Sequence, residues 1–172
     1  MLNANKRGAM HNMINLTYDG ADLSAWVFEL PNKHHHLFKV CFSDGYENIF
    51  YTDVETGRWM EEDLGFTQLA EIVGVSMRPL IKLPVHVPKL LIWHCQYYNN
   101  KLLNFGFFGY TNGRYRLYEI YNTNKRYLYT LMDMENDEWQ ILGNSTTAIN
   151  KIDPIFLDQI IKILPLYSED YG

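Results

Sequence analysis

Apolar and polar residues alternate along much of this chain, in short runs separated by clusters of Gly, Asp, Asn and Pro. In one such run Phe38, Val40 and Phe42 alternate with Lys39 and Cys41. A period of two is typical of antiparallel strands that bury one face. The pattern predicts strands over about residues 13–18, 23–30, 35–42, 47–53 and 58–62, and again over about 90–98, 102–110, 114–121, 126–133 and 138–142.

Two segments have apolar residues at helical spacing instead. In the first, Thr67 can cap the start of a helix and Gly74 can end it. In the second, Asp153 is an N-cap residue, Pro154 suits the first helical position and Pro165 stops the helix. Each helix follows one group of strands, which predicts a strand meander followed by a helix, twice.

The pattern repeats after 80 residues without a gap. Residues 22–60 then lie on residues 102–140 with seven identities, which include Asp53/Asp133, Glu55/Glu135 and Trp59/Trp139. Similar pairs such as Ile49/Tyr129 and Tyr51/Leu131 keep the apolar positions in phase. We therefore expect an α+β fold, with two tandem antiparallel β-meander-plus-helix units related by pseudo-two-fold symmetry in one compact body.

The same pattern divides the chain into four parts. We expect a polar N-terminal tail over 1–12, a first repeat over 13–76, a linker over 77–89 and a second repeat over 90–165. The linker contains Pro79, Pro84 and Pro88 between Leu, Ile and Val residues. This composition favours an extended segment that lies on the protein body and is not a flexible tether.

Composition and charge narrow the class of protein. Aromatic residues make up 15% of the chain and charged residues 20%, which is typical of a folded, sheet-rich domain. The start of the chain has no apolar core of secretory length and no run approaches a membrane span, so we expect a cytoplasmic protein with no membrane partner. The net charge of −5 disfavours nucleic acid. Two cysteines, Cys41 and Cys95, are too few for a disulfide framework.

Catalytic and metal-binding patterns are weak. Of His34, His35 and His36, two can share a strand face, but a metal needs a third ligand, so we expect exposed turn histidines and no metal or cofactor. The repeated Asp-x-Glu-x-x-x-Trp could be a cation site or an acid–base pair. It is better explained by an Asp that accepts turn amides and a Trp that anchors the core. No nucleophile has a base beside it, which predicts that the protein is not an enzyme.

The remaining candidate is a recognition surface. Tyr and basic residues interleave between 114 and 127, and the segment 101–126 has five basic residues and one acidic residue, whereas 44–71 has eight acidic residues and one basic residue. We expect a non-enzymatic cytoplasmic binding module that binds a protein, which could be a second copy, through an aromatic and basic sheet surface. The candidate binding residues are Tyr115, Arg116, Tyr121, Lys125 and Arg126. The alternative is a small-molecule-binding protein or an enzyme with a cleft between the two repeats.

Overall fold

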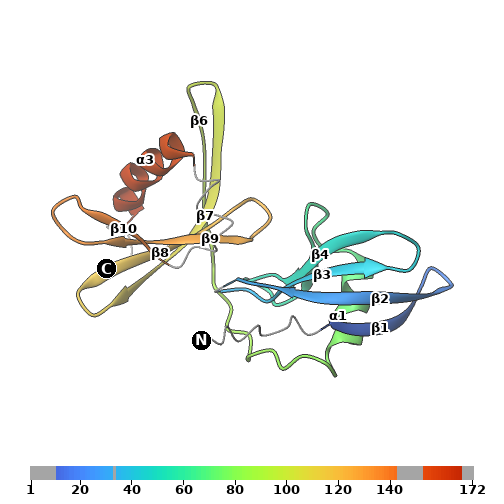
Figure 1. The fold of residues 1–172 in the computed structure, drawn as a ribbon. Coiled ribbons are helices and arrows are strands. Elements are labelled where there is room, and N and C mark those ends of the chain that lie inside the picture. Colours follow the sequence, from blue (N-terminus) through green and yellow to red (C-terminus); the bar gives the residue numbers. More distant parts are fainter. Residues whose placement is uncertain (1–10, 33, 143–152, 168–172) are drawn as a thin grey trace, which may run out of the picture. The chain divides into compact units, whose positions relative to one another are not determined.

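The computed structural model describes residues 11–32, 34–142 and 153–167 (Figure 1). The chain divides into two compact units, Met1–Lys89 and Leu90–Gly172, called unit 1 and unit 2 below. The predicted polar tail lies outside the described residues except at its last two positions. In the described part of the chain, no helix is long and apolar enough to cross a membrane.

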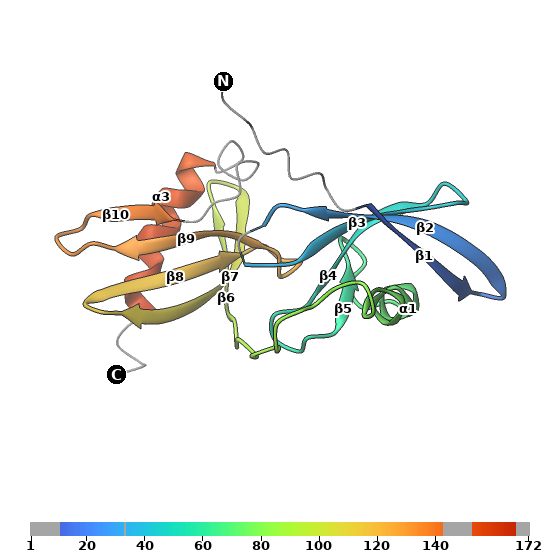
Figure 2. The same ribbon diagram turned by 60° about the horizontal axis from the view of Figure 1, so that its bottom comes forward.

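Unit 1 is a five-stranded antiparallel sheet with one helix. The strands lie in chain order, β1-β2-β3-β4-β5, so that each pairs with the next along the sequence. Their bounds are His11–Tyr18, Ala21–Leu30, Leu37–Phe42, Glu47–Thr52 and Trp59–Glu61. Helix α1, Gln68–Met77, follows the last strand and lies against the sheet in Figure 2. The meander followed by a helix is confirmed for this unit.

Unit 2 has the same kind of sheet, in the order β6-β7-β8-β9-β10. Its strands are Ile92–Tyr98, Lys101–Asn112, Tyr115–Tyr121, Tyr127–Asp133 and Trp139–Leu142. Helix α3, Pro154–Ile163, continues into a short 3₁₀ turn, Leu164–Tyr167, where Pro165 ends the α-helix as expected. The α+β class with two antiparallel sheets is therefore confirmed.

Alternating residues of each sheet build its core. In unit 1 the inward residues of the strands pack with Leu69, Ala70, Val73 and Met77 of α1. Because these four recur at helical spacing, α1 buries one stripe against the sheet. In unit 2 the inward residues of the strands pack with Ile160 of α3 and Leu164 of the 3₁₀ turn.

Helix α1 begins where the sequence predicts and ends later. The Thr67 hydroxyl accepts a hydrogen bond from the Ala70 amide at 3.0 Å, which confirms the N-cap. Gly74, expected to end the helix, lies inside it. A Cβ at this position would be 2.2 Å from the Trp59 indole, so the glycine is needed for close packing of helix and sheet, not for termination.

The first hairpin of each unit has the same geometry. Tyr18 pairs with Ala21 across Asp19-Gly20, and Tyr98 pairs with Lys101 across Asn99-Asn100. All four turn residues have positive φ, as a type I′ turn requires. The next pairings also agree after a shift of 80, since Trp26 pairs with Cys41 and Gly106 pairs with Tyr121.

The fourth strands differ by one residue. In β8–β9 the register shifts after Ile120 pairs with Tyr129, because Tyr121 pairs with Tyr127, as in a β-bulge. The two sequences come back into phase in the next turn of each unit. In unit 1 this turn has six residues between Thr52 and Trp59, whereas in unit 2 it has five between Asp133 and Trp139.

This shift corrects the gapless alignment. Tyr129 and Leu131 both lie in the helix-covered core of unit 2. In unit 1 the residue of β4 that lies in the helix-covered core is Phe50, whereas Ile49 and Tyr51 lie in a separate cluster. The expected pairs Ile49/Tyr129 and Tyr51/Leu131 are thus out of phase, because one extra residue turns a strand's side chains to the other face.

The two tryptophans of the repeated motif do have matching neighbours. The Trp59 ring lies 6.0 Å from the Phe38 ring at an interplanar angle of 39°, and the Trp139 ring lies 5.9 Å from the Tyr118 ring at the same angle. The shared Asp also behaves as expected: Asp53 and Asp133 each accept a hydrogen bond from the amide two residues later. Turn satisfaction and core anchoring therefore explain this motif.

Candidate functional site

The five candidate binding residues do not form one surface. Tyr115 and Arg116 begin β8, whereas Tyr121 ends it and Lys125 and Arg126 lie in the turn that follows. Tyr121 lies five positions after Arg116 on the strand, a span of about 17 Å at the usual rise per residue. Tyr115 and Arg116 are therefore neighbours at one end of β8, with side chains on opposite faces of the sheet, and the other three lie at the opposite end of the strand.

The side chain of Tyr121 does not face solvent. Its side chain is fully buried, and its hydroxyl donates a hydrogen bond to Glu119 at 2.6 Å. Burial, with this carboxylate as a second cause, raises the pKa of Tyr121. The interpretation of Tyr121 as an open binding residue is corrected: it belongs to a buried polar group of unit 2.

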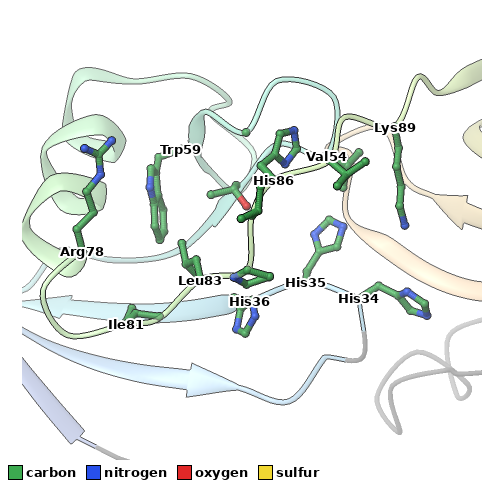
Figure 3. A pocket seen from close by; sticks show the side chains of 15 residues that line it. His34, His35, His36, Val54, Trp59, Arg78, Ile81, Leu83, His86 and Lys89 are labelled. Carbon is green, nitrogen blue, oxygen red and sulfur yellow. The ribbon is translucent and has the colours of Figure 1, made fainter.

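A pocket of about 650 Å³ in unit 1 is the better candidate site, and we call it the histidine-lined pocket (Figure 3). Three segments of the unit form its walls. They are the loop before β3, the β4–β5 turn and the segment 78–89 that follows α1. The lining residues with polar or aromatic side chains are His34, His35, His36, Thr52, Trp59, Arg78, His86 and Lys89.

The loop before β3 supplies three imidazoles. Asn32 holds this loop, because its side-chain oxygen accepts hydrogen bonds from the amides of His34 and His35. His35 is buried, and His34 and His36 are half-buried. The prediction of exposed turn histidines is therefore wrong, because β3 begins at Leu37 and the preceding loop folds against the unit.

The β4–β5 turn forms the second wall. Asp53 is fully buried and its carboxylate accepts hydrogen bonds from the Glu55 amide and the Thr56 hydroxyl. These bonds fix the backbone of the turn. Thr52 and Val54, the neighbours of Asp53 in sequence, then line the pocket.

The segment 78–89 closes the third side. It has no regular secondary structure from Ile81 onward, and the Lys89 amide donates a hydrogen bond to the Val54 carbonyl at 3.0 Å. The His86 ring packs so closely on Gly57 that a Cβ there would be 2.9 Å away. Segment 78–89 therefore lies against the β4–β5 turn, and this position makes it a pocket wall.

The charge of the pocket has one sign. Among the described lining residues, Arg78 and Lys89 are cations and four are histidines, while none is Asp or Glu. Arg78 stands at one end of the pocket and Lys89 at the other in Figure 3. The protein carries a net charge of −5, so this excess of basic groups is local. Such a pocket attracts anions.

Metal binding and catalysis find less support in the same geometry. Within residues 11–32, 34–142 and 153–167, no group of three or more His, Cys, Asp or Glu side chains is placed to hold a metal ion. The described lining contains no carboxylate, and Glu29, which pairs with Nδ1 of His36 at 3.0 Å, does so from outside the lining. What the arrangement can do is bind and orient a negatively charged molecule.

Sequence reasoning found part of this site. The histidine cluster was visible, but its role depends on His86, Arg78 and Lys89, which are 42 to 55 residues away from the loop in the chain. The signal that could have found them is the apolar content of segment 78–89, which indicates that the segment packs on the unit.

Comparison with known proteins adds no relative: no family model matches the chain, and neither the curated proteins nor the solved structures contain a match.

Proposed function

We propose that this protein is a binding module for a small organic anion, and that the histidine-lined pocket is its site. The observation that carries the proposal is the one-sided charge: six basic or ionisable nitrogen side chains line the pocket with no carboxylate among the described lining residues. Its volume of about 650 Å³ lies within the usual range for small-molecule sites. The site is built from unit 1 residues alone.

The apolar part of the lining indicates the chemistry of the rest of the ligand. Trp59 and aliphatic residues, among them Val54, Ile81, Leu83 and Val87, also line the pocket. A bare inorganic ion would leave this surface unused. The fitting ligand therefore has a ring or chain that packs against apolar walls, together with an anionic group of more than one charge that faces Arg78 or Lys89.

The test uses 1-naphthyl phosphate as the probe, measured by isothermal titration calorimetry with the full chain. We expect one site per chain, with about tenfold weaker binding in Arg78→Gln and in Lys89→Gln, a loss of about 1.4 kcal/mol each. Lys82→Gln is the matched control, since Lys82 is an exposed cation of the same segment that does not line this pocket.

Two comparison ligands, each with one part of the probe, complete the design. 1-Naphthol tests whether the ring alone suffices, and inorganic phosphate tests whether the charge alone does. The proposal fails if naphthol binds as tightly as its phosphate, or if Arg78→Gln, Lys89→Gln and Lys82→Gln all behave like the parent protein.

A second candidate function is protein binding at the β7–β8 hairpin. The Arg114 guanidinium lies 4.9 Å from the centre of the Tyr115 ring and donates to its hydroxyl, which presents a cation and an aromatic ring together at the hairpin end. Aromatic rings beside Arg are common in protein interfaces. Tyr115→Ala and Arg116→Ala should then weaken a co-purifying partner without unfolding the chain, whereas Ile120→Ala should destabilise it. Retention of every partner by Tyr115→Ala would exclude this surface.

We also propose that the two units arose by duplication of one meander-plus-helix segment. The support is the common register of the first three strands, the matching I′ turns and the matching tryptophan environments. Unrelated meanders have no physical reason to share these three features at a constant spacing of 80 residues.

A further inference from the structure

Unit 2 contains a groove of about 590 Å³ whose lining is mostly apolar. Its aromatic side chains are Phe107, Phe108, Tyr110, Tyr118 and Tyr167, and we call it the aromatic groove. Phe107 and Tyr167 pack edge to face with their rings 5.2 Å apart. Tyr167 is held further by a hydrogen bond of 2.9 Å between its hydroxyl and Nδ1 of His94. The walls are therefore positioned by contacts within unit 2.

One charged residue lines this groove among the described residues. It is Arg116, which hydrogen-bonds the hydroxyl of Tyr118, also in the lining, and lies opposite Asp133 of β9. A guanidinium has five donors in a planar fork, so it can serve a protein acceptor and a ligand anion together. The groove thus combines an apolar body with one cationic end.

Unit 1 has a groove at the same place that is filled differently. It is lined by Asn12, Val27, Glu29, His36 and Phe38, which a shift of 80 places on Ile92, Phe107, Gly109, Arg116 and Tyr118 of the aromatic groove. The strand registers agree, since Glu29 pairs with Phe38 and Gly109 pairs with Tyr118. The volume in unit 1 is only about 180 Å³.

One difference is that Leu80, Ile81 and Lys82, which follow α1, also line the groove of unit 1. Another is the side chain at the position of Glu29 and Gly109. In unit 1 Glu29 lines the groove, and its carboxylate pairs with Nδ1 of His36 at 3.0 Å. In unit 2 the matching position is Gly109, which has no side chain to place beside Arg116. A glycine inside a strand weakens the strand and is typical of sites where a ligand or another chain approaches closely.

From this comparison we propose that the aromatic groove binds an apolar monoanion, with its carboxylate at Arg116 and its hydrocarbon body between the aromatic walls. A single cationic group matches a single negative charge, which distinguishes this ligand from the anion proposed for the histidine-lined pocket. The groove volume again lies in the range of small-molecule sites. The carboxylate of the ligand takes the place that Glu29 occupies in unit 1.

The decisive variant is Gly109→Glu, which introduces the unit 1 carboxylate into unit 2. Gly109 is exposed, its φ is not positive, and a Cβ there would lie at an ordinary 3.4 Å from the Tyr118 ring, so the fold tolerates a side chain. With decanoate as the probe and the full chain in the calorimeter, we expect Gly109→Glu to weaken binding at least thirtyfold. Gly109→Ala is the matched control and should stay within about threefold of the parent affinity.

Three further measurements test the charge of the ligand, the role of Arg116 and the location of the site in unit 2. Methyl decanoate, which has no charge, should bind at least tenfold more weakly than decanoate. Arg116→Gln should remove that preference even if Gly109→Glu proves unstable in thermal unfolding. Arg78→Gln in unit 1 should leave decanoate binding unchanged. The inference is overturned if decanoate does not bind, if the ester binds as tightly, if Gly109→Glu or Arg116→Gln keeps the parent affinity, or if Arg78→Gln abolishes binding.

Discussion

At the scale of single residues, Trp59 connects the core of unit 1 with its pocket. Only 8% of its surface is exposed, it packs against Phe38, and Gly74 of α1 leaves room for its indole. One edge of the ring still lines the histidine-lined pocket. A ligand in this pocket would therefore contact a side chain that the core already holds in place.

We expect Trp59→Ala to lower the free energy of unfolding by about 3–5 kcal/mol, as for other buried large aromatics. Trp139→Ala should cost less, because Trp139 is only half-buried beside its core. Urea unfolding followed by circular dichroism measures both without relying on tryptophan emission. Equal losses, or a loss within error of zero for Trp59→Ala, would contradict this account.

At the scale of secondary-structure elements, the β8–β9 hairpin carries several buried phenols. Burial raises the pKa of Tyr127 to about 12, and it also raises the pKa values of Tyr121 and Tyr129. The Tyr127 hydroxyl is 2.9 Å from the Thr130 hydroxyl. Each phenol is kept protonated in the folded state at a pH where the unfolded chain loses its proton.

The hairpin should therefore make the protein sensitive to alkali. Because the folded pKa values lie above the ordinary value of 10, the stability they contribute is complete below pH 10 and is lost as the pH rises towards 12. Tyr127→Phe should reduce the loss between pH 10 and 12 by up to about 2 kcal/mol. Tyr97→Phe is the control, since Tyr97 is 74% exposed. Identical pH profiles of stability for the parent and Tyr127→Phe would show that Tyr127 does not cause the loss of stability in alkali.

The elements were largely predictable from the sequence because their signals are local. Asp19-Gly20 and Asn99-Asn100 accept positive φ at low cost, and Thr67 supplies its own cap bond, so turn and helix start follow from adjacent residues. The pocket was not predictable, since it needs the path of segment 78–89 over Gly57. The burial of Tyr121 beside Glu119 was missed for the same reason: alternation gives the face of a strand, not what covers it.

At the scale of the whole molecule, each unit has its own helix-covered core. The core clusters of unit 1 and of unit 2 share no residue, and each contains residues from its sheet and from its helix. The boundary between the units lies between Lys89 and Leu90, so segment 78–89 belongs with unit 1. This organisation is that of two small folding units, each with enough buried apolar surface to be tested alone.

We expect the fragments 1–89 and 90–172 each to unfold cooperatively in urea. A fragment 1–52 is the control: it lacks β5 and α1, so its sheet has no helix to cover it and should show no cooperative transition. Failure of either long fragment to fold would show that the separate cores are insufficient on their own.

The one-residue shift in β9 has a consequence for building hybrids of the two units. The extra residue that enters near Leu128 is offset by the shorter turn before Trp139, so the spacing along the chain is restored while the strand between is rotated to its other face. A chimera that exchanges residues 47–53 for residues 127–133 alone would therefore insert a frame error into the sheet, although the two segments have the same length. Only a cassette that carries the bulge, the strand and the following turn together can be transplanted, and this group of three is the smallest interchangeable part of the fold.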